Sequence, residues 1–310
     1  MLQHLSDKPP LATWTPSIRL FESTCSFADT TEVASRPRPG GRATMNEPDF
    51  TDEEGLTIYL FGLAKKRETV SEIHEYAEDH FSDWFPDLPS YQSYNRRLNR
   101  LSAVFSPLVE KALQEIDCDG SQETMLRIAD SMPIMMAKGQ RASQATVASE
   151  RSPDVGYCSS KNTFYHGVKL HVIAGKRNDK LPLLDRVGLT PGSENDLQAL
   201  RRVLPTIEGG ILCGDKAYCD GPLKERLAED QNLDLLTPIK KEKGQKTLPA
   251  ADKLYSEAVS RIRQPIESLF SWINEKTGIQ RASKVRSYQG LLVHVFGRLA
   301  ASMLILALNP

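Results

Sequence analysis

Three acidic residues lie at positions of the chain where a folded sheet would bring them together. Asp130 follows an apolar run in the segment LRIADSMP, and Asp215 follows another in GILCGDKAY. Glu267 lies near the start of an amphipathic segment, RIRQPIESLFSW. Short apolar runs predict buried strands, and the apolar spacing after Glu267 predicts a helix. Two strand ends and one helix start can meet at a single edge of a sheet.

Carboxylates packed this closely repel one another unless a cation lies between them. Oxygen ligands without thiolates favour Mg²⁺ or Mn²⁺ over zinc. Two such ions, held about 3.5–4 Å apart by carboxylates, form a common device for cutting and rejoining phosphodiester bonds. We therefore expect Asp130, Asp215 and Glu267 to be catalytic residues and also the ligands of two Mg²⁺ or Mn²⁺ ions.

The order of the expected elements points to one fold class. After residue 117 the periodicity predicts, in chain order, strands at 123–134, 162–175 and 181–189, a helix at 195–207, a strand at 211–215, a helix at 222–231 and a strand at 233–239. Helices at 250–276, with a break at Pro265, and at 287–308 complete the chain. The polar segment 138–160 predicts a mobile loop.

This is the order of the ribonuclease H-like fold, an α/β fold in which helices flank a mixed sheet. In that fold the first strand, the fourth strand and a later helix converge. Here these three elements carry Asp130, Asp215 and Glu267, so the fold and the expected metal site support each other.

The segment 45–118 predicts a small all-helical domain ahead of the sheet, with helices at about 52–65, from residue 70 and at 90–115. The last of these carries an apolar stripe, and three arginines lie off it: Arg96, Arg97 and Arg100. Two helices, a turn and a longer basic helix are compatible with a helix-turn-helix-like DNA-binding domain. A helical bundle with an exposed basic face fits the same pattern, and both interpretations stay open.

The first 44 residues have no apolar period and end in RPRPGGR, a composition typical of disorder. Met45 precedes the first patterned segment. Either the natural start is Met45, or residues 1–44 form a basic arm that contacts DNA. The expected organisation is thus a disordered or non-native segment 1–44, a helical domain 45–118 and a catalytic domain 119–310.

The formal net charge of −1 gives no support by itself for nucleic-acid binding, but basic residues gather locally. Besides the arginines above, they form two clusters: Lys240, Lys241, Lys243 and Lys246; and Arg281, Lys284 and Arg286. Phosphate contacts dominate DNA affinity, so basic clusters flanking a carboxylate site suggest DNA as the partner.

Cysteine usage and the apolar C-terminus bear on location. The five cysteines form no CxxC pair, which suits a reducing cytoplasm better than a disulfide framework. The apolar segment 291–308 contains His294 and Arg298, and a charge inside a membrane span is costly. We expect a buried core helix there and no membrane partner.

The segments quoted above resemble, in order, those of the DDE transposases of bacterial insertion sequences. In that family the second Asp lies in a GDKGY-type segment and the Glu lies four residues after an Arg, here Arg263. An aromatic-x-Gly-x-Lys-Leu-His strand appears here as YHGVKLH, which contains Lys169 and His171. The resemblance covers about 52–308. Only the 51 residues 216–266 separate Asp215 from Glu267, which leaves no room for the large insertion of some transposases.

The chain departs from the family pattern at a few positions. Ala217 stands where the GDKGY-type segment has Gly, Asn274 where many relatives have Lys, and Ser260 where some have Tyr. The change at Asn274 would weaken phosphate contacts without removing the metal site.

The resemblance implies a transposase that binds element ends and catalyses metal-dependent DNA cleavage and strand transfer without a covalent protein–DNA intermediate. Its partners would be double-stranded DNA, as terminal repeats and target, and a second copy in a homodimeric DNA complex. It would act in the bacterial cytoplasm, at the nucleoid when bound to DNA. The residues expected to contact DNA are Arg96, Arg97, Arg100, Lys169, His171, Lys216, Lys240, Lys241 and Arg263.

Some of these roles have alternatives. His171 is equally well explained as a structural residue, and Arg263 either orients Glu267 or contacts a phosphate. Tyr218 is a further candidate substrate contact, whereas Asn195 and Asp196 are expected only to cap a helix. For the whole protein, the alternative is a catalytically silent DNA-binding protein derived from a transposase. The helical front and the basic loop 240–249 argue against a general ribonuclease H-like nuclease.

Overall fold

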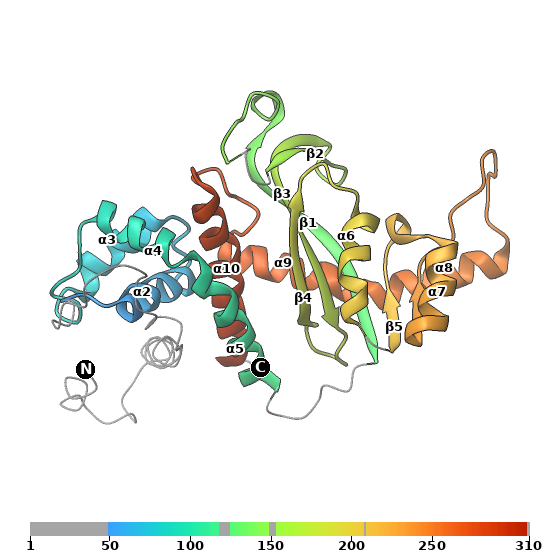
Figure 1. The fold of residues 1–310 in the computed structure, drawn as a ribbon, viewed down its shortest axis with the longest axis horizontal. Helices are drawn as coiled ribbons and strands as arrows, with labels where there is room; N and C mark the ends of the chain where they lie inside the picture. The colour runs from blue at the N-terminus through green and yellow to red at the C-terminus, as the bar shows by residue number, and fades with distance from the viewer. Residues whose placement is uncertain (1–48, 118–124, 149–152, 208, 309–310) are drawn as a thin grey trace.

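The computed structural model of the chain describes residues 49–117, 125–148, 153–207 and 209–308. A helical front lies beside a curved mixed sheet that has helices on both faces (Figure 1). The expectations for residues 1–44 lie outside the described residues.

The helical front consists of α2 (Asp52–Ala64), α3 (Val70–Phe81), α4 (Tyr91–Arg100) and α5 (Phe105–Asp117). Capping boxes begin the first two helices, in which Thr51 pairs with Glu54 and Thr69 with Glu72. The single helix expected at 90–115 is wrong, because a 3-10 turn, Ser102–Val104, separates α4 from α5. Pro107 then lies in the first turn of α5, where its missing N–H costs nothing.

The sheet contains β1 (Leu126–Lys138), β2 (Asp154–Cys158), β3 (Thr163–Gly175), β4 (Leu183–Pro191), β5 (Gly210–Cys213) and β6 (Leu233–Leu236). Its order is β2-β3-β1-β5-β6, and β4 also pairs with β3. Strands β1 to β4 pair in antiparallel fashion, whereas β5 and β6 are parallel to β1. Strand β2 lies inside the segment expected to be a loop, so the loop prediction is wrong there.

Helices cover both faces of the sheet. Apolar side chains of α6 (Asp196–Val203) and α7 (Gly221–Gln231) pack on one face, where Leu200 and Leu223 meet Ile173 and Leu212. On the other face lie α8 (Ala250–Arg263) and α9 (Pro265–Thr277), which contact β1. Figure 1 shows α8 and α9 following each other across the sheet, as the break expected at Pro265 predicts.

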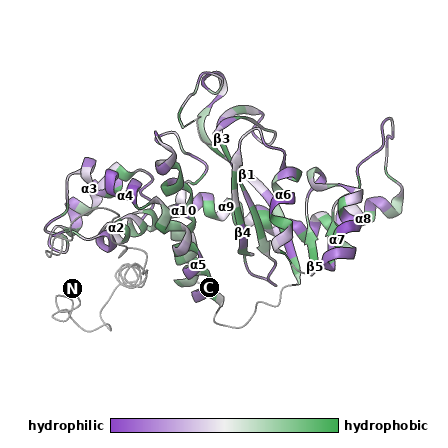
Figure 2. Ribbon diagram, viewed as in Figure 1, coloured by the Kyte–Doolittle hydropathy of each residue, from purple (hydrophilic) through white to green (hydrophobic). Residues whose placement is uncertain are grey.

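The last helix, α10 (Tyr288–Leu308), joins the helical front to the sheet side of the molecule. It packs against α5, α2, α4 and α9. Figure 2 shows apolar residues along it. Among the described helices it alone is long and apolar enough to cross a membrane, but 72% of its most apolar window is buried within the protein. The burial agrees with the expected core helix.

A buried arginine fixes this junction. The Arg298 guanidinium donates to the carbonyl oxygen of Thr277, the last residue of α9, at 2.9 Å and to the Tyr59 hydroxyl of α2 at 3.3 Å. It also donates to the Glu68 carbonyl oxygen in the α2–α3 turn. One hydrophobic core accordingly extends from Phe50 to Leu306. The predicted fold class is confirmed: an α/β, ribonuclease H-like mixed sheet flanked by helices and preceded by a helical region.

Candidate active site

Asp130 and Asp215 lie level with each other where β1 and β5 part. The two strands are parallel neighbours, and Ile128 and Cys213 form their last residue pair. Each aspartate follows two residues later, so both side chains emerge at the same end of the paired region. The two apolar runs in the sequence predict this convergence of Asp130 and Asp215.

Local hydrogen bonds hold both aspartates. The Ser131 N–H donates to Oδ1 of Asp130 at 2.8 Å, and the Ala217 N–H donates to Oδ1 of Asp215 at 2.7 Å. The second bond makes Asp215 the N-cap of a short 3-10 turn, Lys216–Tyr218. Each carboxylate keeps its other oxygen for a further partner.

Glu267 reaches the same place through Arg263, which is the last residue of α8. The Arg263 guanidinium donates one hydrogen bond to Oδ2 of Asp130 at 2.5 Å and another to Oε1 of Glu267 at 2.6 Å. Glu267 lies in the first turn of α9, where the helix dipole favours a negative charge. Acids from β1 and α9 thus converge on one cation.

Burial and neighbouring negative charges disfavour the ionised form of Asp130. Burial raises the pKa of Asp130 to about 6; the Arg263 guanidinium and the Ser131 N–H oppose the rise, and the charges of Asp215 and Glu267 add to it. Burial alone would lower the pKa of Arg263, but Asp130 and Glu267 outweigh it and raise that pKa. Asp215 is therefore close enough to Asp130 for their charges to interact.

As the side chains stand, no three Asp, Glu, His or Cys residues within the described ranges are grouped closely enough to hold a metal ion. The donor chemistry nevertheless fits a divalent cation. Asp130 and Glu267 already share one positive charge, and all three acids offer hard oxygen ligands of the kind that Mg²⁺ and Mn²⁺ prefer. In the structure Arg263 neutralises Asp130 and Glu267, the same two carboxylates that such an ion would neutralise.

A second polar cluster lies across β1 from this site. Lys169 on β3 donates to the Glu194 carbonyl oxygen at 2.8 Å and to Oδ1 of Asp196 at 3.2 Å. The same Asp196 oxygen accepts from the Ser131 hydroxyl at 3.2 Å. Lys169 is therefore engaged with protein groups, although sequence reasoning assigned it to DNA.

His171 belongs to this cluster and fits the structural alternative. Its Nε2 is 2.8 Å from the Thr190 hydroxyl, and burial lowers the pKa of the ring to about 4. Asp196 accepts hydrogen bonds from both Ser131 and Lys169. The sequence did not predict this central role, because Asp196 was expected only to cap a helix. Its partners Ser131 and Lys169 are 65 and 27 residues away in the chain, and no local pattern marks such a contact.

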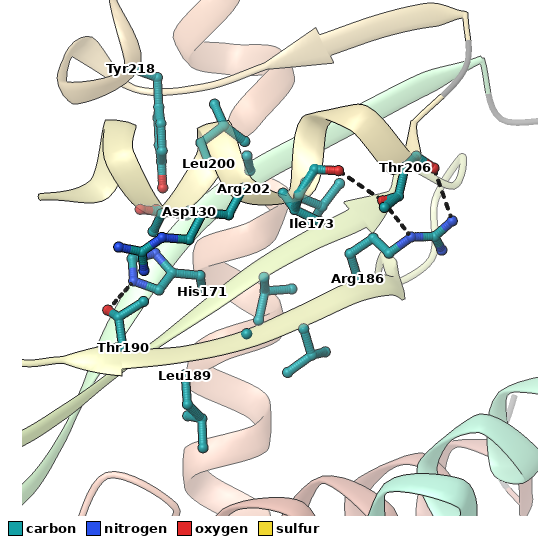
Figure 3. Close-up of a pocket in the computed structure, with 16 residues that line it drawn as sticks. Asp130, His171, Ile173, Arg186, Leu189, Thr190, Leu200, Arg202, Thr206 and Tyr218 are labelled. Carbon is teal, nitrogen blue, oxygen red and sulfur yellow. Dashed lines mark hydrogen bonds between the residues drawn. The ribbon is translucent and has the colours of Figure 1, made fainter. Parts of the chain in front are cut away.

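A cavity of about 340 Å³ opens beside Asp130, between α6 and strands β3 and β4 (Figure 3). Its walls are mostly apolar, and Arg186 and Arg202 also line it. Tyr218 closes one side; burial, followed by the charges of Asp196, Asp130 and Asp215, raises the pKa of its hydroxyl. Asp130 therefore borders an open space on the α6 side of the sheet.

The three arginines of α4 are not equivalent. Arg97 donates to Oδ1 of Asp52 at 2.5 Å and to the Phe50 carbonyl oxygen at 2.7 Å, so it ties α4 to the start of α2. Arg96 and Arg100 are exposed, and no ion pair in the described part of the chain involves them. They remain the residues of this helix that can meet a phosphate.

The other predicted DNA contacts lie on exposed surface. Lys216 follows Asp215 directly and is exposed. Lys240 and Lys241 are exposed in the segment between β6 and α8, where Lys241 donates to the Lys246 carbonyl oxygen at 2.8 Å. Lys216 is thus adjacent to the carboxylates in the chain, while the two lysines precede the helix that ends at Arg263.

The chain thus combines a ribonuclease H-like sheet with acidic residues where β1 and β5 part and on α9, a combination typical of proteins that cut or rejoin nucleic-acid strands. A family model for the transposase DDE domain matches residues 122–304, which is more than half of the chain. The chain therefore belongs to the DDE transposase family. Membership implies metal-dependent DNA cleavage and transfer in general terms. No curated protein and no solved structure matches the chain.

Proposed function

We propose that this chain is the transposase of a bacterial insertion sequence, which binds the ends of its element and cuts and transfers DNA strands. The observation that carries the proposal is the convergence of Asp130 and Glu267 on the Arg263 guanidinium, with Asp215 beside them. Family membership indicates the class of reaction, and the three converging acids are the candidate residues for catalysing it.

In this proposal Asp130, Asp215 and Glu267 would together hold two divalent ions. When bound, such ions would activate the attacking water or DNA 3′-hydroxyl and stabilise the leaving oxygen. Arg263 keeps the acids together and neutralised until then. The α6-side cluster around Asp196 fixes β1 and β3 behind them, because Ser131 and Lys169 both donate to that carboxylate.

The DNA partners would be the element ends and the target, bound by a homodimer in the cytoplasm. Arg96 and Arg100 on α4, and Lys240 and Lys241 before α8, are the exposed cations that support this assignment. Replacing both Arg96 and Arg100 with Ala should weaken binding to element ends and reduce its salt dependence, because fewer phosphates are neutralised. The Arg97→Ala variant should instead lose stability, because it breaks the ion pair with Asp52.

The decisive experiment is strand cleavage on a plasmid that carries the reading frame with its own flanking DNA. Wild-type protein should nick or cut at the element boundaries with Mg²⁺ or Mn²⁺ and not with EDTA. Glu267→Gln should abolish cleavage. Glu275→Gln offers a matched control, since Glu275 is an exposed acid on the same helix that pairs with its neighbour Lys276 at 3.5 Å.

The second candidate is a catalytically silent protein that only occupies the element ends. Asn274 favours it, because many relatives have a Lys at this position and the Asn side chain here accepts from the Gln280 N–H at 3.2 Å. Binding to the element ends without cleavage under any divalent ion would support the silent protein and refute the enzyme.

A further inference from the structure

A pair of aromatic rings is exposed at the tip of the β2–β3 hairpin. Tyr157 and Phe164 are 49% and 59% exposed and lie opposite each other in the strand register. Their ring centroids are 5.0 Å apart at an interplanar angle of 55°. Exposed apolar side chains are normally scattered singly, so two in contact at a hairpin tip point to a binding role.

The same tip adjoins a basic loop. Lys161, between the two strands, donates to Oε1 of Gln280 at 2.7 Å. Backbone hydrogen bonds from Met135 to Gln280 and from Ala282 to Met135 hold this loop along β1. The loop joins α9 to α10, and Figure 1 shows it beside the end of the sheet that carries the hairpin.

The two adjoining segments carry only positive charge. Residues 157–164 (YCSSKNTF) and 278–286 (GIQRASKVR) contain four Lys or Arg residues and no Asp or Glu. Arg281 pairs with Glu68 of the helical front. The remaining cations, Lys161, Lys284 and Arg286, are exposed, and none of them takes part in an ion pair within the described residues.

Aromatic faces beside uncompensated cations have the chemistry that binds unpaired bases: the rings stack on bases and the cations meet phosphates. A fully paired duplex hides its base faces, so the rings distinguish a single strand from a duplex. A second copy of this chain is a poor occupant, because a two-fold contact would set Lys161, Lys284 and Arg286 against their own copies.

We propose that Tyr157, Phe164 and Lys161, here called the hairpin platform, bind single-stranded DNA, with Lys284 and Arg286 contacting its phosphates. This inference rests on the proposed function, since it takes DNA as the substrate and adds a surface for an unpaired strand. Lys138, which is opposite Tyr165 in the sheet, is eight residues after Asp130 on β1. At roughly 3.3 Å per residue the platform is therefore about 26 Å from the carboxylates, so it holds DNA and takes no part in the chemistry.

The test compares the full-length wild-type protein with a Tyr157→Ala/Phe164→Ala variant. Fluorescence anisotropy in EDTA, at fixed salt, would measure affinity for a labelled oligothymidine strand and for a blunt duplex of the same length. Stacking contributes about 1–3 kcal/mol per base, so the variant should lose on the order of 10- to 100-fold for the single strand. Its affinity for the duplex should change by less than about threefold.

Controls separate the rings from other causes. Tyr157→Phe keeps the ring and should bind as wild type does. Leu254→Ala removes an apolar side chain that is 70% exposed on α8, and it should change neither affinity. If the alanine variant has a lowered melting temperature, Tyr157→Thr/Phe164→Thr replaces it, because threonine suits a strand. Lys161→Ala should lower the salt dependence of single-strand binding.

Several results would overturn the proposal. Unchanged single-strand affinity in the double variant would show that the hairpin platform does not bind DNA. An equal loss of affinity for both probes would show that the platform does not prefer unpaired bases. A wild-type dimer that becomes monomeric in the variant, seen by light scattering, would make the pair a subunit interface. Wild-type protein that binds neither probe would instead refute the proposed function, a result distinct from all of these.

Discussion

Replacing Arg263 with Ala should tighten the binding of Mn²⁺. In the structure the guanidinium donates to Asp130 at 2.5 Å and to Glu267 at 2.6 Å, and its side chain is only 16% exposed. A metal ion that takes these carboxylate oxygens has to displace the arginine. The alanine variant removes this competitor and leaves the acids with no other cation between them.

The magnitude follows from the two contacts. A hydrogen bond to a charged group contributes about 1.5–3 kcal/mol, which applies to the Asp130 end. Glu267 is 58% exposed, so solvent screens the other end and it adds about 0–1 kcal/mol. The sum of about 1.5–4 kcal/mol corresponds to an affinity gain on the order of 10- to 1000-fold.

Isothermal titration of Mn²⁺ into the DNA-free protein would measure this gain. Arg263→Lys is the matched control, because it keeps the charge but one ammonium group cannot span both acids in the same way. Its affinity should lie between those of wild type and the alanine variant. Weaker Mn²⁺ binding by Arg263→Ala would refute the reasoning and show that Arg263 holds Glu267 in place for the metal.

Gly62→Ala should destabilise the protein by about 1–3 kcal/mol, because its new Cβ would lie 2.7 Å from two buried carbon atoms of Ile73. Gly55→Ala, in the same helix with its nearest contact at 3.5 Å, should gain roughly 0.5–1 kcal/mol; melting temperatures would check both. Arg298→Met should cost about 2–5 kcal/mol in urea unfolding, since it leaves two backbone carbonyl groups without a donor. Burial lowers the pKa of His171 from 6.5 to about 4, so protonation favours the unfolded chain and stability falls as the pH drops through this window. His171→Gln should flatten that fall in urea titrations at pH 7 and pH 5.

The parts of the fold that local pattern governs were predictable. Thr69 and Glu72 mark the start of α3 because a capping box uses side chains three residues apart. The apolar runs before Asp130 and Asp215 predict β1 and β5, since buried strands need them.

Contacts between segments that are far apart in the chain could not be predicted from the sequence. In strand β2, Gly156 lies close to the backbone of Gly192, where an added Cβ would lie 2.3 Å from the carbonyl oxygen. Nothing near residue 156 in the chain signals that approach. Arg97 lies off the apolar stripe, as predicted, yet it pairs with Asp52, which is 45 residues away. The pattern fixes which face a side chain is on, and the tertiary fold decides its partner.

The central claim is that Asp130, Asp215 and Glu267 hold the metal ions that cut DNA, and Asp215→Asn tests it most directly. The change keeps the shape of the side chain and removes one charged ligand, while the basic surfaces stay intact. With Mg²⁺, strand cleavage at the element boundaries should fall by orders of magnitude, and DNA affinity in EDTA should hold or rise slightly. Asp234→Asn, an exposed aspartate on the neighbouring strand β6, should cut as wild type does. A folded Asp215→Asn variant that cuts at the wild-type rate would contradict the account.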